Sequence, residues 1–128
     1  MKILRLPQFL DDARLLSTQN ASVIPFSIRR VFIICDVQAD TLRGKHAHKK
    51  TKQAMFCIQG SVHVRLSDGK KKRVYRLTDP RRGIFIDRLV WSEMYNFSSD
   101  AILMVFASDY YKEGDYIRDY KNFLKLIK

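Results

Sequence analysis

The chain has 128 residues, of which 46% are hydrophobic, so it is long enough for one domain with a packed core and too apolar to be disordered. No apolar run reaches the roughly 18–20 residues that cross a bilayer, and the N-terminus lacks the apolar stretch of a secretory signal, so we expect a cytoplasmic protein with no membrane partner. The formal net charge of +11 favours an anionic ligand, but the basic residues are not interleaved with stacking aromatics as in nucleic-acid binders, and we expect no nucleic-acid partner.

The N-terminal segment and the strands that follow it differ in pattern. Residues 9–16 have apolar residues at spacings that predict one or two helical turns. After them, runs rich in β-branched and aromatic residues recur at short intervals, with turn-forming pairs such as Asp68-Gly69 and Asp79-Pro80 between them. The predicted strands are residues 22–37, the extended segment around 43–48, and residues 53–58, 61–66, 72–77, 83–86, 88–97 and 101–108.

Helical spacing of apolar residues returns in residues 118–127, which we expect to form a short C-terminal helix. Short strands separated by turns, without helices between them, indicate a sandwich or barrel. The prediction is therefore one all-β domain over residues 1–128 that ends in a helix. Cys35 and Cys57, each flanked by strand-forming residues, are expected to be buried reduced thiols. Four tyrosines are expected to pack the terminal helix onto the barrel: Tyr110, Tyr111, Tyr116 and Tyr120.

Residues 43–53, RGKHAHKKTKQ, contain two of the chain's three histidines. His46 and His48 are two positions apart, which on an extended strand places both side chains on one face. From the residues alone, three interpretations of this pair stay open: metal ligands, packed core side chains, or groups that move a proton.

The spacing around the pair is that of a metal motif. His46-Ala-His48, then Gln53 and Gly60, resembles the first motif of the cupin fold, a double-stranded β-helix or jelly-roll barrel. The shape of that fold's second motif is recognisable in residues 87–96. However, Gln53 stands where the motif has a carboxylate, and Ser92 stands where it has a third histidine. Since a transition metal is usually held by three or four His, Cys or carboxylate ligands, we expect no metal here.

Pure packing is also a poor explanation, because burying two imidazoles without partners is unfavourable. A histidine whose pKa is about 6.5 is suited to proton abstraction at neutral pH. An arginine such as Arg43 can hold a phosphate through two parallel hydrogen bonds. The residues therefore favour metal-free proton transfer on a phosphorylated substrate.

Beyond the histidine pair, the chain from about Arg14 to Phe123 resembles one family. RGKHAHK at 43–49, ASDYY at 107–111 and DYIRDY at 115–120 are together similar to the dTDP-4-keto-6-deoxyglucose 3,4-ketoisomerases, small cupin enzymes of deoxyamino-sugar biosynthesis. The resemblance implies a cupin-type double-stranded β-helix (jelly-roll barrel), a homodimer, and no metal or organic cofactor. It also implies that a dTDP-linked keto sugar binds in the mouth of the barrel.

The resemblance also implies roles for individual residues. Such an enzyme removes the C3 proton, which is acidic beside the C4 ketone, and returns a proton to C4 after an enediolate has formed. His48 is then the general base, His46 its partner in positioning or proton delivery, and Gln53 a hydrogen-bond donor to the enediolate. Three arginines would bind the substrate: Arg30 and Arg43 at the pyrophosphate and Arg14 at the sugar.

The chain departs from the family's pattern at positions that bear on proton return to C4. Phe32 and Ile33 replace two tyrosines that are common after Arg-Val, and Ser92 replaces a histidine. Arg14 and Arg118 lie where control of the C4 configuration could sit, and we expect the galacto product. Two alternatives stay open at this point: a metal-dependent cupin enzyme, and a non-catalytic cupin that binds a nucleotide sugar.

Overall fold

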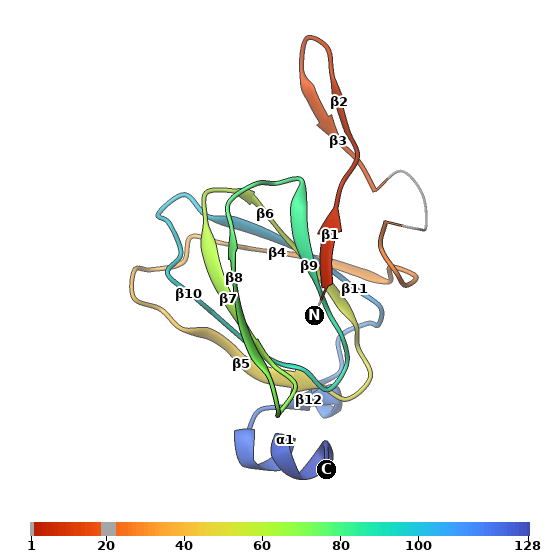
Figure 1. Cartoon of the computed structure of the whole chain (residues 1–128), viewed down its shortest axis with the longest axis vertical. Helices are drawn as coiled ribbons and strands as arrows, with labels where there is room; N and C mark the ends of the chain where they lie inside the picture. Colours follow the sequence, from red (N-terminus) through yellow and green to blue (C-terminus); the bar gives the residue numbers. More distant parts are fainter. Residues whose placement is uncertain (1, 19–22) are drawn as a thin grey trace.

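Two five-stranded antiparallel sheets enclose the core in the computed structural model, which describes residues 2–18 and 23–128 (Figure 1). The first sheet has the order β1-β9-β6-β11-β4, and the second has the order β12-β5-β10-β7-β8. The first sheet consists of β1 (Lys2–Arg5), β9 (Arg82–Ile86), β6 (Gln53–Gln59), β11 (Ile102–Ala107) and β4 (Arg30–Cys35). The second consists of β12 (Tyr116–Ile117), β5 (Arg43–His48), β10 (Trp91–Tyr95), β7 (Val62–Ser67) and β8 (Lys72–Leu77).

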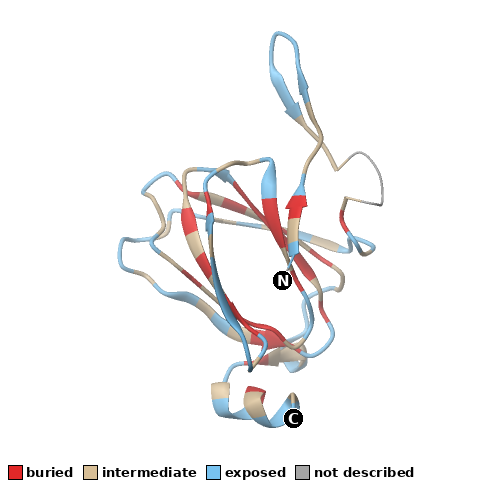
Figure 2. Ribbon diagram, viewed as in Figure 1, coloured by how far each residue is buried: buried red, intermediate tan, exposed pale blue. Residues whose placement is uncertain are grey.

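Period-two patterning determines which side chains enter the core. In β11, Leu103 and Val105 are fully buried, whereas the residues between them are half-buried. In β7, Val62 and Val64 are likewise buried and alternate with more accessible residues. The buried faces of the two sheets meet between them, as the buried segments in Figure 2 show. Each fully buried aliphatic side chain contributes about 1.5–3 kcal/mol of transfer free energy, which stabilises this closed arrangement.

The predicted all-β barrel is confirmed, and most predicted strands correspond to observed ones. Residues 72–77 form β8 as predicted, and residues 53–58, 61–66, 83–86, 88–97 and 101–108 contain or overlap β6, β7, β9, β10 and β11. The predicted strand 22–37 begins at Ser22, which lies outside the described residues, and its described part is a strand only over β4.

The prediction of helical turns in residues 9–16 was wrong. The segment forms a hairpin instead, in which β2 (Gln8–Leu10) pairs with β3 (Arg14–Leu16). Asp11 explains the difference, since its side chain accepts a hydrogen bond from the Ala13 amide at 2.9 Å and so stabilises a tight turn. The hairpin projects from one end of the barrel, away from the helix at the other end (Figure 1).

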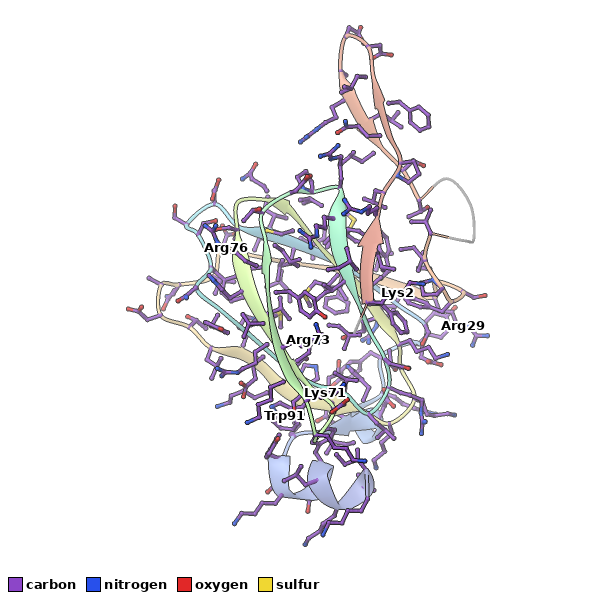
Figure 3. The ribbon with its side chains drawn as sticks, viewed as in Figure 1. Lys2, Arg29, Lys71, Arg73, Arg76 and Trp91 are labelled. Carbon is purple, nitrogen blue, oxygen red and sulfur yellow. The ribbon has the colours of Figure 1, made fainter. Side chains whose placement is uncertain are left out.

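The predicted C-terminal helix is confirmed as α1 (Tyr120–Leu126). Asp119 caps its N-terminus by accepting hydrogen bonds from the Lys121 and Asn122 amides. Phe123 is completely buried and packs on Trp91, which lies at the helix-covered end of the barrel (Figure 3). A short 3-10 turn, η1 (Glu113–Asp115), precedes β12.

The basic residues of β8 and the turn before it lie on the outside of the barrel, where Figure 3 shows Lys71, Arg73 and Arg76. The expectation for the cysteines was half right. Cys57 is buried in the core, but Cys35 is exposed at the end of β4; both are free thiols. Among the described residues, no helix is both long and apolar enough to cross a membrane.

Candidate active site

A cavity of about 220 Å³ lies on the inner side of the barrel and receives side chains from both sheets. Its walls combine apolar groups with two cations and an imidazole. Its lining includes Phe32, Arg43, His46, Gln53, Ser92, Tyr116 and Arg118.

The two histidines lie against each other at this cavity, on one face of β5 as predicted. The ring centroids of His46 and His48 are 5.1 Å apart, and the rings are nearly perpendicular. His46 lines the cavity, whereas His48 is only 4% exposed and lies directly behind it. Both rings contact Tyr116, at 5.1 Å and 4.4 Å between centroids. The pair and this tyrosine form one aromatic cluster in the cavity wall.

Asp115 fixes the orientation of His48. Nδ1 of His48 lies 2.8 Å from Oδ2 of Asp115, and the same oxygen accepts a hydrogen bond from the Thr51 hydroxyl at 2.5 Å. The other carboxylate oxygen accepts a hydrogen bond from the Lys50 amide at 2.7 Å. Although burial raises the pKa of Asp115, these hydrogen bonds outweigh it and hold the pKa below its usual value. Asp115 is therefore a carboxylate, and His48 donates its Nδ1 proton to it.

The protonation state of the pair follows from burial. Burial, together with the neighbouring His48, lowers the pKa of His46 to about 4. Burial also lowers the pKa of His48, and the hydrogen bond to Asp115 opposes this change only in part. Both imidazoles are therefore neutral at pH 7. With Nδ1 protonated, Nε2 of His48 carries a lone pair, and this atom is buried without a hydrogen-bond partner among the described residues.

Arg43 and Gln53, both predicted from the sequence, line the same cavity. Arg43 begins β5, and Gln53 begins β6 on the opposite sheet, so the cavity collects them from two directions. Ser92 is buried and pairs with His46 in the register of β10 with β5. Gly44 allows this close approach: its φ is +85°, and a Cβ there would lie 2.9 Å from the Ser92 carbonyl oxygen.

The other two predicted arginines lie elsewhere. Arg30 starts β4 next to the cavity-lining Phe32, with its guanidinium 5.2 Å from that ring's centroid, and its Nε is buried without a partner among the described residues. Arg14 lies on β3, in the projecting hairpin, and is exposed. Neither is among the residues that line the cavity with His46. Their roles in substrate binding stay predictions.

Sequence reasoning missed Asp115 and misread Tyr116. We expected Tyr116 to pack the terminal helix, yet it belongs to β12, which pairs with β5 and puts Tyr116 opposite His48. Tyr120 does pack this helix, by contacting Trp91, whereas Tyr110 and Tyr111 are exposed. The available signal was the segment DYIRDY itself, which supported the family resemblance but gave no indication of contact with the histidines.

Arg118, which also lines the cavity, is held in place by two neighbours. Its guanidinium lies 4.3 Å from the centroid of the Tyr116 ring and donates two hydrogen bonds to Glu113, at 2.8 and 3.0 Å. Hydrogen bonds from Arg118 and from the Tyr111 hydroxyl lower the pKa of Glu113 to about 2. This arginine is therefore a fixed positive charge at the cavity.

The chemistry of the site is that of a neutral base with nearby cations. No group of three or more His, Cys, Asp or Glu side chains within residues 2–18 and 23–128 is arranged to hold a metal ion. Two histidines, an amide and a hydroxyl form a poor donor set for a transition metal. The same residues are well arranged to take a proton and to attract an anionic substrate.

Comparisons with known proteins identify the family. The chain matches the family model FdtA, described as WxcM-like, C-terminal, over residues 1–128. It is 43% identical over 127 residues to the TDP-4-oxo-6-deoxy-alpha-D-glucose-3,4-oxoisomerase of Aneurinibacillus thermoaerophilus, covering 98% of this chain and 91% of that protein.

Solved structures agree with this assignment. A 3,4-ketoisomerase from Helicobacter canadensis has a TM-score of 0.94 and 41% identity, with 98% of this chain and 96% of that chain covered. A histidine-to-asparagine mutant of the 3,4-ketoisomerase QdtA from Thermoanaerobacterium thermosaccharolyticum, in complex with TDP-4-keto-6-deoxyglucose, has a TM-score of 0.94 and 36% identity over 98% of this chain and 92% of that chain. The fold, the histidine site and these relatives together show that the chain belongs to the cupin-type sugar 3,4-ketoisomerases, a family of isomerases.

Proposed function

We propose that this chain converts TDP-4-keto-6-deoxyglucose into a TDP-3-keto-6-deoxyhexose, with His48 as the general base. The observation that carries the proposal is the state of His48: neutral, oriented by Asp115, and with a lone pair on a buried Nε2 that has no partner among the described residues. The substrate is the sugar nucleotide bound by the QdtA mutant and named for the relative from A. thermoaerophilus.

The reaction moves two hydrogens and changes no net oxidation state. The C3–H bond breaks as Nε2 of His48 takes the proton, which leaves an enediolate across C3 and C4. A C4–H bond then forms, while the proton on the C3 oxygen is lost and the C4 oxygen gains one. The product carries its ketone at C3 and a hydroxyl at C4. His46, in ring contact with His48, assists by positioning the substrate or relaying a proton.

The cavity supplies groups for the rest of the substrate. Gln53 lies across from the histidines and is positioned to donate a hydrogen bond to an enediolate oxygen. Arg43 lines the cavity and binds the pyrophosphate in this proposal. Arg30, whose buried Nε is unpartnered among the described residues, assists at the rim next to Phe32. No metal or organic cofactor takes part.

We propose the galacto configuration at C4 for the product. Arg118 lies at the cavity and Arg14 lies on the projecting hairpin, so the two could act on the sugar only from different directions. The coupling between the C4 proton and its neighbours in the product distinguishes the galacto from the gluco sugar.

The proposal includes a homodimer in the cytoplasm. Val31 and Ile33 of the edge strand β4 are 51% and 55% exposed, and they lie opposite Phe106 and Met104 of β11 on the outer face of the first sheet. An exposed apolar edge strand invites pairing or packing with another chain. A second copy of this chain would cover that face and leave the cavity, on the inner side of the sheet, accessible.

The test is an NMR time course with TDP-4-keto-6-deoxyglucose in deuterated water, comparing wild type with His48→Asn and His46→Asn. We expect wild type to form a 3-keto sugar with deuterium at C4, and His48→Asn to bind TDP normally but to neither convert the sugar nor exchange its C3 proton. Binding without conversion by wild type would contradict the proposal. Full loss of C3 exchange in His46→Asn alone would transfer the base role to His46.

A further inference from the structure

We propose that Tyr116 is the acid that protonates the C4 oxygen during the isomerisation and then recovers a proton from the C3 oxygen. This inference rests on the proposed function and adds to it, because His48 accounts only for the hydrogen that moves between carbons. The hydrogen that moves between the two oxygens needs a group that can both give and take a proton.

Few groups in the cavity wall can perform that exchange. The guanidinium groups of Arg43 and Arg118 do not release protons under physiological conditions, and the Gln53 amide does not titrate. His46 is neutral, because burial lowers its pKa to about 4, so it holds no imidazolium proton to give at pH 7. Ser92 offers a hydroxyl that is a much weaker acid than a phenol. Tyr116 is the phenol among the described lining residues.

The position of Tyr116 fits this role. Its ring lies 4.4 Å from the His48 ring and 5.1 Å from the His46 ring, measured between centroids. The proton transfers at the carbons and those at the oxygens would therefore take place within one cluster of side chains. The hydroxyl has no hydrogen-bond partner among the described residues, which leaves it available to a ligand oxygen. By contrast, the nearby Tyr111 hydroxyl is already bonded to Glu113 at 2.5 Å.

Arg118 is placed to stabilise the negative charge that Tyr116 carries once it has given up its proton. Its guanidinium lies over the Tyr116 ring at 4.3 Å and is fixed there by two hydrogen bonds to Glu113. A positive charge over the ring stabilises the phenolate that exists while the C4 oxygen holds the Tyr116 proton. The arrangement is preorganised, because the Arg118–Glu113 pair exists before any substrate binds.

The step is balanced in atoms and charge. The O–H bond of Tyr116 breaks as a bond forms between that hydrogen and the C4 oxygen, while His48 takes the C3 proton. The phenolate then takes the proton from the C3 oxygen as the C3 ketone forms, and His48, after exchange of its proton with solvent, delivers a proton (a deuteron in deuterated water) to C4. Tyr116 and His48 both end in their starting states, and no oxidant, reductant or second substrate is required.

The decisive variant is Tyr116→Phe, because phenylalanine keeps the ring against both histidines and under Arg118 and removes only the hydroxyl. Initial rates with TDP-4-keto-6-deoxyglucose and C3 deuterium exchange are measured for wild type, Tyr116→Phe, Tyr111→Phe and Tyr95→Phe. Tyr95 stacks on His63 on the outer face of the barrel, so its variant is a matched control for the loss of a phenol. Melting temperature and affinity for TDP monitor folding.

We expect kcat of Tyr116→Phe to fall by about 10²–10³-fold with KM within about threefold of wild type, and C3 exchange to slow in parallel. Tyr95→Phe should match wild type. A folded Tyr116→Phe that converts substrate within threefold of wild type, or a loss confined to Tyr111→Phe, would overturn the inference. If wild type itself gives no conversion, the proposed function fails instead, so the two failures are distinguishable.

Discussion

Asp115 and His48 are 67 residues apart in the sequence, yet Oδ2 of Asp115 lies 2.8 Å from Nδ1 of His48, behind the cavity-lining His46. The carboxylate selects one tautomer of the imidazole and so determines which nitrogen can act as a base. The histidine pair is therefore only half of the proposed proton-transfer apparatus. The other half comes from β12 and the turn before it, and it reaches β5 through the pairing of Tyr116 with His48.

Replacing Asp115 by Asn should lower kcat by about 10²–10⁴-fold while changing KM little. An amide can accept the Lys50 hydrogen bond but provides no charge to hold the proton on Nδ1 of His48, so the wrong tautomer becomes populated. Steady-state kinetics and nitrogen NMR of the His48 ring measure the two effects. Thr51→Val, which removes one donor to Asp115, should give a smaller loss. Wild-type kcat and tautomer in Asp115→Asn would show that Asp115 only packs.

Acid should destabilise the protein between about pH 6.5 and pH 4. His46 titrates at about 6.5 in an unfolded chain and at about 4 in the folded one, so the unfolded chain binds more protons throughout that interval. The free energy of unfolding therefore falls as the pH falls, by at most about 1.4 kcal/mol per pH unit for this histidine. His48, whose pKa is also lowered, adds to the slope.

Urea unfolding of wild type and His46→Asn at several pH values measures that slope. The slope should become shallower in His46→Asn. Equal slopes in wild type and His46→Asn would show that burial of His46 does not set the pH dependence.

Replacing Arg43 by Lys should raise KM by about 10–100-fold and leave kcat within a few fold. Lysine keeps the charge but cannot form the two parallel hydrogen bonds that a guanidinium offers to a phosphate group. Calorimetric titration with TDP tests the same contact without turnover. Arg73→Lys, on the exposed outer strand β8, is the matched control. If TDP affinity is unchanged in Arg43→Lys, the pyrophosphate lies elsewhere.

Introducing a charge on β4 should break the proposed dimer. Ile33→Lys places an ammonium in the exposed apolar face of the first sheet, which a second copy would have to desolvate. Analytical ultracentrifugation should show a monomer, with far-UV circular dichroism unchanged. Val74→Lys is the control, because Val74 is 53% exposed on β8 of the other sheet. Identical sedimentation of wild type and Ile33→Lys would exclude this face as the interface.

Sequence patterns identified the elements whose periodicity is long enough to read. β7 and β11 span six residues each. Apolar and polar residues alternate in β7, and β11 is apolar throughout, so both were recognisable as strands. β1 and β12 have four and two residues, too few to establish a period. In residues 9–16 the apolar spacing fits a helix as well as a hairpin, and the turn at Asp11 decides between them.

The residues of the candidate site also divide into those that local sequence patterns indicate and those that they do not. His46, Arg43 and Gln53 lie near one another in sequence or at strand starts, and the cavity brings them together as expected. Asp115 and Tyr116 could not be assigned in the same way, because their contacts with His48 arise from a long-range pairing that no local pattern encodes. Arg14 was placed wrongly for a different reason: helical turns were predicted for residues 9–16, so its position on a projecting hairpin could not be foreseen.

The late position of β12 has a consequence for truncation. Every other strand of the two sheets ends by Ala107, whereas Asp115 and Tyr116 follow it in the chain. A chain cut between Ala107 and Asp115 would keep all the other strands of both sheets but lose the carboxylate bound to His48 and the phenol ring against it. Such a deletion would separate the strands that build the barrel from the residues that complete the site.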